Sequence, residues 1–216
     1  MTQTRFITFE GGEGAGKTSQ IRLLKEALSN SGILVVQTRE PGGSPGAEDI
    51  RQLLVSGSVE RWHPLSEVLL HYAARVEHVN KTILPALKVG KWVISDRFAD
   101  STTAYQGYGH GVDLNRLNDL HTACLGDFHP DLTLILDIPV EQGLDRARQR
   151  ETSAEGKGED RYERMELDFH HRLREGFLNI ARQQPERCAV VDARSDIETI
   201  AAEIREIVTA RLEIAL

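Results

Sequence analysis

Near the amino terminus, eight consecutive residues have types and spacing that suit phosphate binding. They are Gly11, Gly12, Glu13, Gly14, Ala15, Gly16, Lys17 and Thr18, and they fit the pattern G-x-x-x-x-G-K-[ST]. The glycines let successive backbone N–H groups turn toward phosphate oxygens. Lys17 can reach the β- and γ-phosphates of a nucleotide, and Thr18 can offer its hydroxyl to Mg²⁺. The segment predicts a loop that holds a nucleoside triphosphate.

The residues on either side of this loop have the order that such a loop requires. Residues 5–10 are rich in β-formers, and apolar residues recur at helical spacing from Ile21 to Leu28. A strand, a glycine-rich loop and a helix bring the phosphates to the positive end of the helix. A chance match in a glycine-rich turn is the alternative, and this setting argues against it.

Two other predicted strands end in charged side chains. Arg39 follows the strand predicted for residues 33–38, and Asp96 and Arg97 follow the apolar run at residues 92–94. Ligands of open α/β sheets bind at the carboxyl ends of the strands. Arg39 is compatible with an anion contact or with a solvated surface position. The pair Asp96 and Arg97 is either a structural ion pair or a site for metal and phosphate, and the neighbouring phosphate loop favours the second.

Strand-like and helical patterns alternate along the whole chain. The predicted strands are 5–10, 33–38, 90–97, 132–137 and 189–192, and the predicted helices include 64–87, 113–125, 140–149 and 197–212. Residues 39–46 are predicted to be a rigid loop, and residues 101–109 a short helix that ends in a flexible loop. The alternation predicts a single α/β domain over residues 1–216, with a five-stranded parallel sheet and helices on both faces.

One polar stretch near the carboxyl-terminal third has the composition of a mobile lid. Residues 151–161 contain almost no apolar side chain, and glycines stand on both sides of Lys157. Arg146, Arg148 and Arg150 precede the stretch. We expect a lid at about residues 148–162 that closes over a phosphate, with an ordinary solvated loop as the alternative.

The composition limits the class of protein. The 216 residues carry a net charge of −7, which argues against general nucleic-acid binding. Cys124 and Cys188 lack metal-type spacing and suit a reducing compartment. The sequence has no evident signal peptide or bilayer-spanning run, so a cytoplasmic protein without membrane contact is expected. His170 and His171 are expected to be solvated surface residues.

Several segments together resemble bacterial thymidylate kinases. They are residues 10–18, 38–43, 73–78, 95–98 with Ser101, 104–107 and 160–163, in the same order as in that family. The resemblance covers nearly the whole chain. It implies a three-layer P-loop kinase fold and transfer of the γ-phosphoryl group of ATP to dTMP, which gives dTDP for dTTP synthesis. It also implies Mg²⁺ as cofactor, dTMP and ATP as partners, and a homodimer.

The resemblance further implies a role for each candidate site residue. Glu13 would accept a hydrogen bond from the sugar 3′-hydroxyl, Arg39 and Arg97 would hold the acceptor phosphate, and Arg75 would bond thymine O4. Tyr105 would crowd the sugar C2′ and disfavour a ribonucleotide. The other implied contacts are Ser101, Thr102 and Gln106 to the substrate or near its base edge, and Thr18 and Asp96 to Mg²⁺ or its waters.

The phosphate loop lacks the arginine that some members of the family carry, because that position is Gly14. The resemblance therefore makes Arg150 and Arg161 candidates for a catalytic cation at the γ-phosphate, alongside Lys17 and Arg97. His71 stands four residues before Arg75, where a phenylalanine commonly stacks on thymine. Whether His71 or Tyr72 takes that place stays open, and the lid is longer than usual.

Other classes of function fit the sequence less well. A different nucleoside monophosphate kinase would use the same fold. A GTP-dependent switch needs D-x-x-G and N-K-x-D, but no glycine has an aspartate three residues before it, and residues 80–83 lack the final aspartate. If the chain were a non-catalytic nucleotide-binding module, Asp96, Arg97 and the basic lid would have no function.

Overall fold

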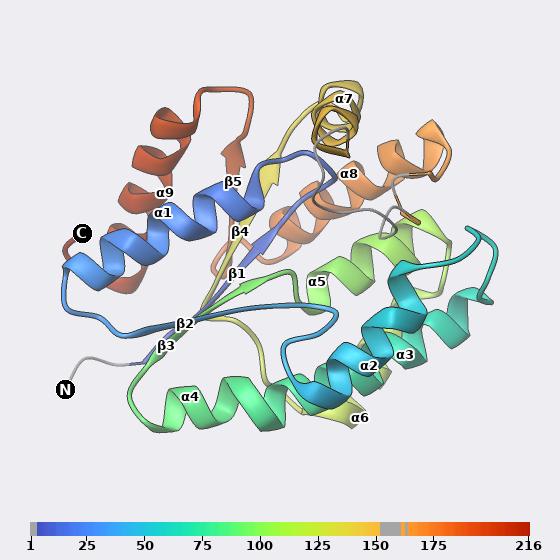
Figure 1. The fold of residues 1–216 in the computed structure, drawn as a ribbon, viewed down its shortest axis with the longest axis horizontal. Helices are drawn as coiled ribbons and strands as arrows, with labels where there is room; N and C mark the ends of the chain where they lie inside the picture. The colour runs from blue at the N-terminus through green and yellow to red at the C-terminus, as the bar shows by residue number, and fades with distance from the viewer. Residues whose placement is uncertain (1–3, 152–160, 163) are drawn as a thin grey trace.

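A computed structural model describes residues 4–151, 161–162 and 164–216. Five parallel strands form one sheet in the order β2-β3-β1-β4-β5. The strands are β1 (Phe6–Glu10), β2 (Val35–Arg39), β3 (Trp92–Asp96), β4 (Leu132–Asp137) and β5 (Cys188–Asp192). The predicted five-stranded parallel sheet is thereby confirmed, and all carboxyl ends meet at one edge (Figure 1).

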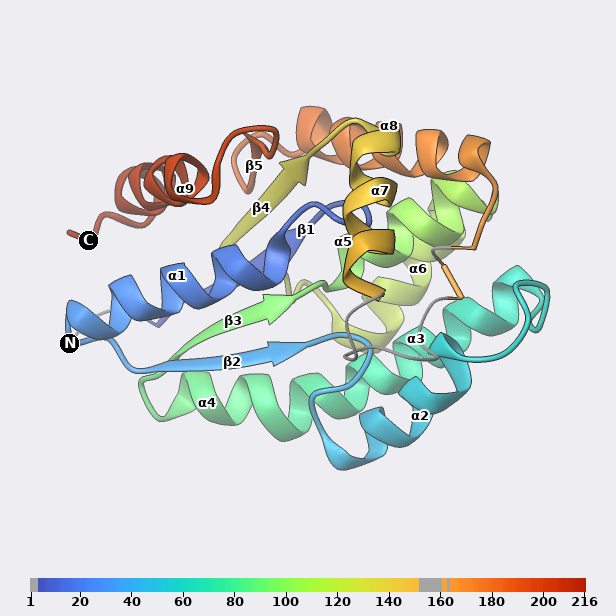
Figure 2. The ribbon, with the colours of Figure 1, turned by 45° about the horizontal axis from the view of Figure 1, so that its top comes forward.

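Helices cover both faces of this sheet and extend beyond its carboxyl edge. Their bounds are α1 (Lys17–Asn30), α2 (Pro45–Val55), α3 (Pro64–His78), α4 (Leu84–Lys88), α5 (Ala99–Thr102), α6 (Leu114–Leu125), α7 (Val140–Glu151), α8 (Leu167–Gln183) and α9 (Ile197–Leu212), with π-helical stretches η1 (Val79–Ile83) and η2 (Thr103–Gly109). Helices α1 and α9 lie on one face, whereas α4, α5 and α8 lie on the other. Figure 2 shows α2, α3 and α7 beyond the strand ends, around the region where the phosphate loop lies.

The central strands are buried on both faces, as parallel strands require. Ile7 and Phe9 of β1 face α1, where they share a core with Leu134 of β4. On the opposite face, the Thr8 hydroxyl bonds the Thr133 hydroxyl at 2.9 Å. This alternation directs Glu10, the last residue of β1, toward α5 rather than α1.

Residues 40–44 form the predicted loop, but its last two residues, Pro45 and Gly46, begin a helix, and residues 103–109 are also helical. Helix α2 begins at Pro45, where a proline is tolerated because the first helical N–H groups have no partner in the helix. Residues 103–109 form η2 instead of a flexible loop. A Cβ on Gly107 would lie 2.5 Å from Leu114, and one on Gly109 would lie 2.4 Å from Phe169. These glycines therefore permit close packing and do not mark a break.

The remaining differences from the expected elements are small. The helix predicted for residues 64–87 consists of α3, η1 and α4, with Pro85 in the first turn of α4. His170 is buried although it was expected at the surface, whereas His171 is exposed. Within the described ranges, no helix is long and apolar enough to cross a bilayer.

Candidate active site

The glycine-rich loop connects β1 to α1 and packs closely against α7. Gly11, Gly14 and Gly16 have φ angles of 131°, 67° and 88°, which favour glycine. A Cβ on Gly14 would lie only 1.9 Å from the carbonyl oxygen of Gly143, so the two backbones touch. This contact is the physical reason why the loop position of Gly14 has no room for an arginine.

Lys17 turns its ammonium back toward the loop. Its Nζ donates hydrogen bonds to the carbonyl oxygens of Gly11 at 3.2 Å and Gly12 at 3.1 Å. Burial and the nearby Arg97 lower the pKa of Lys17, while surrounding carboxylates oppose that shift. The ammonium thus lies beside the backbone of the glycine-rich loop, whose N–H groups are of the kind that bind anionic oxygens.

A cavity of about 370 Å³ opens at the carboxyl edge of the sheet. It is lined by these predicted site residues: Glu13, Gly14, Ala15, Gly16, Lys17, Thr18, Arg39, Arg75, Asp96, Arg97, Ser101, Thr102, Tyr105 and Gln106. The cavity is also lined by His71, one of the two candidates for the base-stacking place, and by Glu40, Arg51 and Tyr162, which sequence reasoning did not assign to the site. The structure therefore brings most of the predicted site into one basic cavity of the size that nucleotide-sized ligands need.

Arg97 lies at the exit of β3 in a backbone conformation that is unusual for its type. Its φ is 71°, and its guanidinium donates to the Gly11 carbonyl at 3.1 Å and to Glu13 Oε1 at 3.1 Å. The Tyr105 hydroxyl donates to the same oxygen of Glu13. Although burial opposes it, Arg97 and Lys17 lower the pKa of Glu13 to about 2. Glu13 and Arg97 are therefore both charged and jointly ordered.

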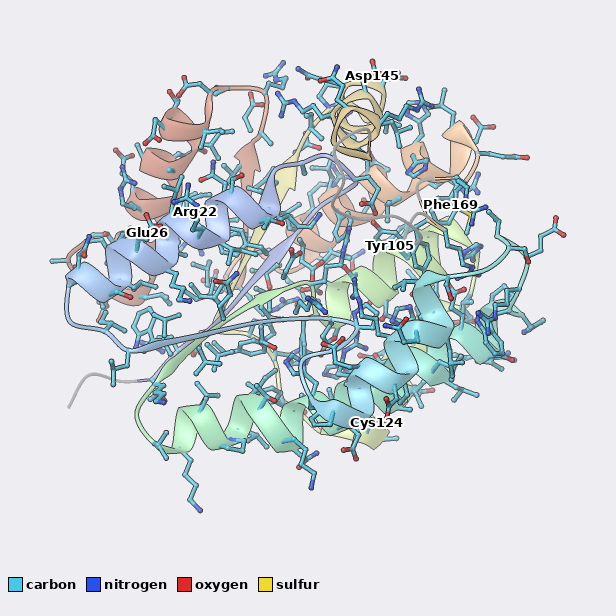
Figure 3. All side chains as sticks on the ribbon, viewed as in Figure 1. Arg22, Glu26, Tyr105, Cys124, Asp145 and Phe169 are labelled. Atoms are coloured by element: carbon cyan, nitrogen blue, oxygen red, sulfur yellow. The ribbon has the colours of Figure 1, made fainter. Side chains whose placement is uncertain are left out.

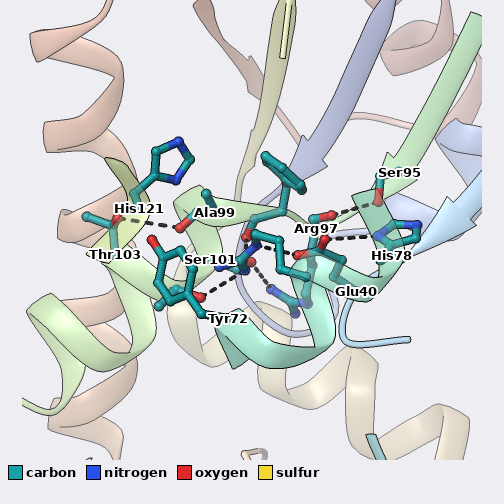
Figure 4. A network of polar contacts seen from close by, with 12 residues as sticks. Glu40, Tyr72, His78, Ser95, Arg97, Ala99, Ser101, Thr103 and His121 are labelled. Carbon is teal, nitrogen blue, oxygen red and sulfur yellow. Dashed lines mark hydrogen bonds and ion pairs between the residues drawn. The ribbon is translucent and has the colours of Figure 1, made fainter. Parts of the chain in front are cut away.

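Glu10 holds the residues that follow Arg97 and was not identified from the sequence. Its carboxyl oxygens accept the Phe98 backbone N–H at 2.7 Å and the Ser101 hydroxyl at 2.5 Å. The Ser101 oxygen in turn accepts a bond from Arg97 at 3.2 Å (Figure 4). Burial, with a contribution from Asp100, raises the pKa of Glu10 to about 8. Glu10 thus fixes both the backbone and the side chain of Arg97.

Arg75 of α3 is fully buried. Its Nε donates to Glu40 at 2.8 Å, and one terminal nitrogen donates to the Phe98 carbonyl at 3.1 Å and to Thr102 at 3.0 Å. The other, Nη1, is buried and has no hydrogen-bond partner among the described residues. Since unpaired buried donors are costly, this nitrogen is poised for a ligand acceptor in the cavity.

Glu40 orients Arg75 and was also missed. Its second carboxylate oxygen bonds His78 Nδ1 at 2.9 Å (Figure 4). His78 Nε2 in turn bonds the Thr38 hydroxyl at 2.7 Å. Although burial opposes it, Arg75 and His78 lower the pKa of Glu40. Sequence reasoning selected Arg39 in this segment because it follows a predicted strand. Nothing local in the sequence shows that the next residue, Glu40, faces the buried Arg75.

Of the two aromatic candidates beside Arg75, only His71 lines the cavity. Burial lowers the pKa of His71 to about 4, so the imidazole is neutral near pH 7. Its Nε2 lies 3.1 Å from the Tyr162 hydroxyl. Tyr72 instead packs its ring against the Arg75 guanidinium, 4.7 Å from ring centre to Cζ. Tyr72 therefore packs against Arg75 without lining the cavity.

Asp96 and Thr18 could contribute to a magnesium site. Asp96 Oδ1 is buried and has no hydrogen-bond partner in the described part of the chain, and Thr18 lines the same cavity from the first turn of α1. No group of three or more His, Cys, Asp or Glu side chains suited to a metal occurs in the described ranges. One carboxylate and a hydroxyl fit Mg²⁺, which keeps several waters and takes phosphate oxygens as further ligands.

The predicted phosphate-binding arginines differ in how they are held. Arg39 lines the cavity but is exposed and pairs with Glu48 at 3.2 Å. Arg161 differs from the expectation of a cation at the γ-phosphate. It is 1% exposed, pairs with Glu67 at 2.5 Å and does not line the cavity. The side chain of Arg150 and lid residues 152–160 lie outside the described residues.

Comparisons with known proteins agree with this geometry. A family model described as thymidylate kinase matches residues 9–204. A thymidylate kinase of Caulobacter vibrioides is 51% identical over 98% of this chain and 99% of its own length, and one of Afipia carboxidovorans is 52% identical over 98% and 92%. A crystal structure of thymidylate kinase from Ehrlichia chaffeensis has a TM-score of 0.77 and 38% identity, and covers 95% of this chain and 98% of that one.

Proposed function

The chain belongs to the thymidylate kinase family, and from this premise we propose how its residues serve the reaction. The chain phosphorylates dTMP to dTDP with ATP as the phosphoryl donor. We place the ATP phosphates on the glycine-rich loop beside Lys17 and dTMP in the remainder of the cavity. The observation that carries this arrangement is that Arg75 lines the same cavity as the phosphate loop, while its buried Nη1 has no hydrogen-bond partner among the described residues.

The proposed mechanism relies on positioning and on neutralisation of charge. Phosphoryl transfer passes through a loose transition state with charge spread over the transferred oxygens. Lys17 neutralises charge on the donor, and Arg97 holds the acceptor phosphate from the opposite side. Arg97 lies within hydrogen-bond distance of Gly11 and Glu13 of the loop, so donor and acceptor phosphates would meet there. Arg39 adds a more exposed contact to the acceptor.

Mg²⁺ is the cofactor we propose for Asp96 and Thr18. When bound, it would neutralise charge on the phosphate oxygens. Asp96 would supply the buried oxygen that has no partner within the described ranges, and Thr18 its hydroxyl, directly or through water. The base would lie between His71 and Arg75, with Nη1 of Arg75 donating to thymine O4 and Thr102 and Gln106 near the base edge.

A substrate panel tests this proposal directly. The protein is incubated with ATP, Mg²⁺ and each nucleoside monophosphate, and diphosphate formation is measured. We expect dTMP to have the highest kcat/KM. A higher value for another monophosphate would favour a different nucleoside monophosphate kinase, and an absence of diphosphate would favour a binding module.

Sugar selection provides a second test, centred on Tyr105. Its ring lies 5.0 Å from the Arg97 guanidinium, and its hydroxyl bonds Glu13. Tyr105→Ala should lower the preference for dTMP over its ribonucleotide by roughly tenfold, because the steric barrier at C2′ is lost. Tyr105→Phe keeps the ring and should retain the preference. Equal kcat/KM ratios in wild type and Tyr105→Ala would assign sugar selection to another residue.

The assembly and location of the protein are further parts of the proposal. A homodimer is expected, and Leu65 and Leu69 of α3 are candidates for its interface because both are exposed apolar residues. Sedimentation in solution measures the assembly. The proposed location is the cytoplasm, and the chain is proposed to act as one domain.

A further inference from the structure

Glu67 of α3 is a buried carboxylate to which the reaction assigns no role. It is 1% exposed. Its Oε1 accepts hydrogen bonds from Gln106 Nε2 at 2.7 Å and from the Tyr162 hydroxyl at 3.0 Å. Its Oε2 accepts Arg161 Nη1 at 2.5 Å. Glu67 therefore joins two residues of the cavity wall, Gln106 and Tyr162, to an arginine outside it.

Arg161 prevents this carboxylate from turning. Besides its bond to Glu67, the guanidinium donates to three backbone carbonyls, those of Ser58 at 3.0 Å, Leu54 at 3.3 Å and Val59 at 2.8 Å. A buried guanidinium with this many bonds cannot move without leaving charge and carbonyl oxygens unpaired. Although burial opposes it, His71, Gln106 and Arg161 lower the pKa of Glu67, so both oxygens act as acceptors.

The acceptor at Glu67 determines which way the Gln106 amide points. An ionised carboxylate accepts hydrogen bonds only, so the Gln106 nitrogen must face it. The reversed amide would bring two oxygens together inside the protein. Gln106 is 1% exposed and lines the cavity, so its carbonyl oxygen is the group left to meet a ligand.

We propose that Glu67 is a positioning residue that fixes Gln106 so that its carbonyl oxygen reads the N3–H of the base. With Arg75 Nη1 as donor to O4, the pair selects a 4-oxo pyrimidine with a proton on N3. A 4-amino pyrimidine has the opposite pattern, an acceptor at N3 and a donor at position 4. The inference rests on the proposed placement of the base beside Arg75 and Gln106.

Glu67→Gln tests this polarity while keeping the shape of the side chain. A bond to a charged group is stronger than one between neutral groups, so the single oxygen of the introduced amide should face Arg161. The NH₂ group of that amide then faces Gln106, which must reverse its own amide and present a donor to the base. The probe is 5-methyl-dCMP, which differs from dTMP only in the groups at positions 3 and 4.

The measured quantity is the ratio of kcat/KM for dTMP to kcat/KM for 5-methyl-dCMP. We expect Glu67→Gln to lower this ratio at least about tenfold, since discrimination by hydrogen bonds to the base is lost. The change should lie mainly in KM for the two substrates. A purely structural ion pair would affect both substrates equally and leave the ratio unchanged, which would overturn the proposal.

Glu26→Gln is the matched control. Glu26 pairs with Arg22 at 2.7 Å on the outer side of α1, and both side chains are more than half exposed (Figure 3). The same chemical change at this exposed ion pair should leave the ratio at the wild-type value. A lower ratio in Glu26→Gln would also contradict the proposal, because selection would then not depend on Gln106.

Two more variants separate the outcomes. Gln106→Met removes the amide and should lower the ratio; an unchanged ratio would instead refute the proposed placement of the base. A lower ratio in Gln106→Met with an unchanged ratio in Glu67→Gln refutes only the role of Glu67.

If Glu67→Gln does not fold, the double variant Glu67→Met with Arg161→Met replaces the buried pair by apolar side chains, which is often tolerated. It should show the same loss, and an unchanged ratio would overturn the proposal.

Discussion

Replacing Arg97 with alanine is expected to lower kcat for dTMP by about 10³-fold, the scale of a lost cation in phosphoryl transfer. Arg97 contacts the phosphate loop through Gly11 and Glu13, and Glu10 holds the backbone that follows it. Although burial opposes the charge, the nearby Tyr105 and Glu13 raise the pKa of Arg97 above its ordinary value. The guanidinium is therefore a permanent charge in a fixed position.

Single-turnover kinetics with saturating ATP and dTMP measure this effect on the chemical step. The dissociation constant for ATP should change little, because Lys17 and the loop N–H groups remain. Arg39→Ala is the matched control, since that arginine is exposed and pairs with Glu48. Its loss should be smaller, roughly tenfold, because an exposed charge is screened. A kcat for Arg97→Ala within about threefold of wild type, well short of a lost transition-state cation, would remove Arg97 from the mechanism.

The parts of the site that the sequence predicted correctly carry local signals. The phosphate loop has a fixed spacing of glycines and Lys17, and the apolar strands next to it allow few other folds. Asp96 and Arg97 could be placed because they follow such a strand, and parallel strands end at a common edge. These signals need no knowledge of distant contacts.

The residues that were missed are carboxylates whose role depends on tertiary contacts. Glu67 is an ordinary polar residue in a helical pattern, and no neighbouring residue in the sequence indicates that it bonds to Gln106 and Tyr162. Glu10 reads as the end of a strand, yet its partners Phe98 and Ser101 lie about ninety residues later. Burial of such groups follows from packing of distant segments, which periodicity does not encode.

The surroundings of Arg161 could likewise not be predicted from the sequence. The resemblance made Arg161 a candidate for a cation at the γ-phosphate, because position 14 of the phosphate loop is a glycine. In the structure its guanidinium is enclosed by three carbonyl oxygens of residues 54–59 and by Glu67. The sequence shows that position 161 carries a cation. The carbonyl groups that determine where its guanidinium points belong to a segment about one hundred residues earlier in the chain.

Gly14→Ala is expected to lower kcat/KM for ATP by about 10²-fold, the scale of an ångström-sized misplacement of reacting groups. The added Cβ would lie 1.9 Å from the Gly143 carbonyl oxygen and 2.7 Å from its carbon. These neighbours belong to the backbone of α7, so the loop or the helix must move. A shifted loop would misalign the N–H groups that bind phosphate. Gly14→Arg should lose at least as much, although it adds a cation near the γ-phosphate.

Backbone strain must be separated from this collision, because Gly14 also has a φ of 67°. Gly126 is the matched control: its φ is 61°, and a Cβ there would meet nothing within 4 Å. Gly126→Ala should cost about 1–3 kcal/mol in free energy of unfolding, because φ of 61° with ψ of −132° is a conformation that residues with a side chain rarely adopt, and it should leave kcat/KM unchanged. Thermal unfolding and ATP titration of both variants distinguish the causes. A Gly14→Ala protein with wild-type kcat/KM would show that the close approach to α7 is dispensable. A reduced value in Gly14→Ala alone would indicate that this contact positions the loop and excludes an arginine from it.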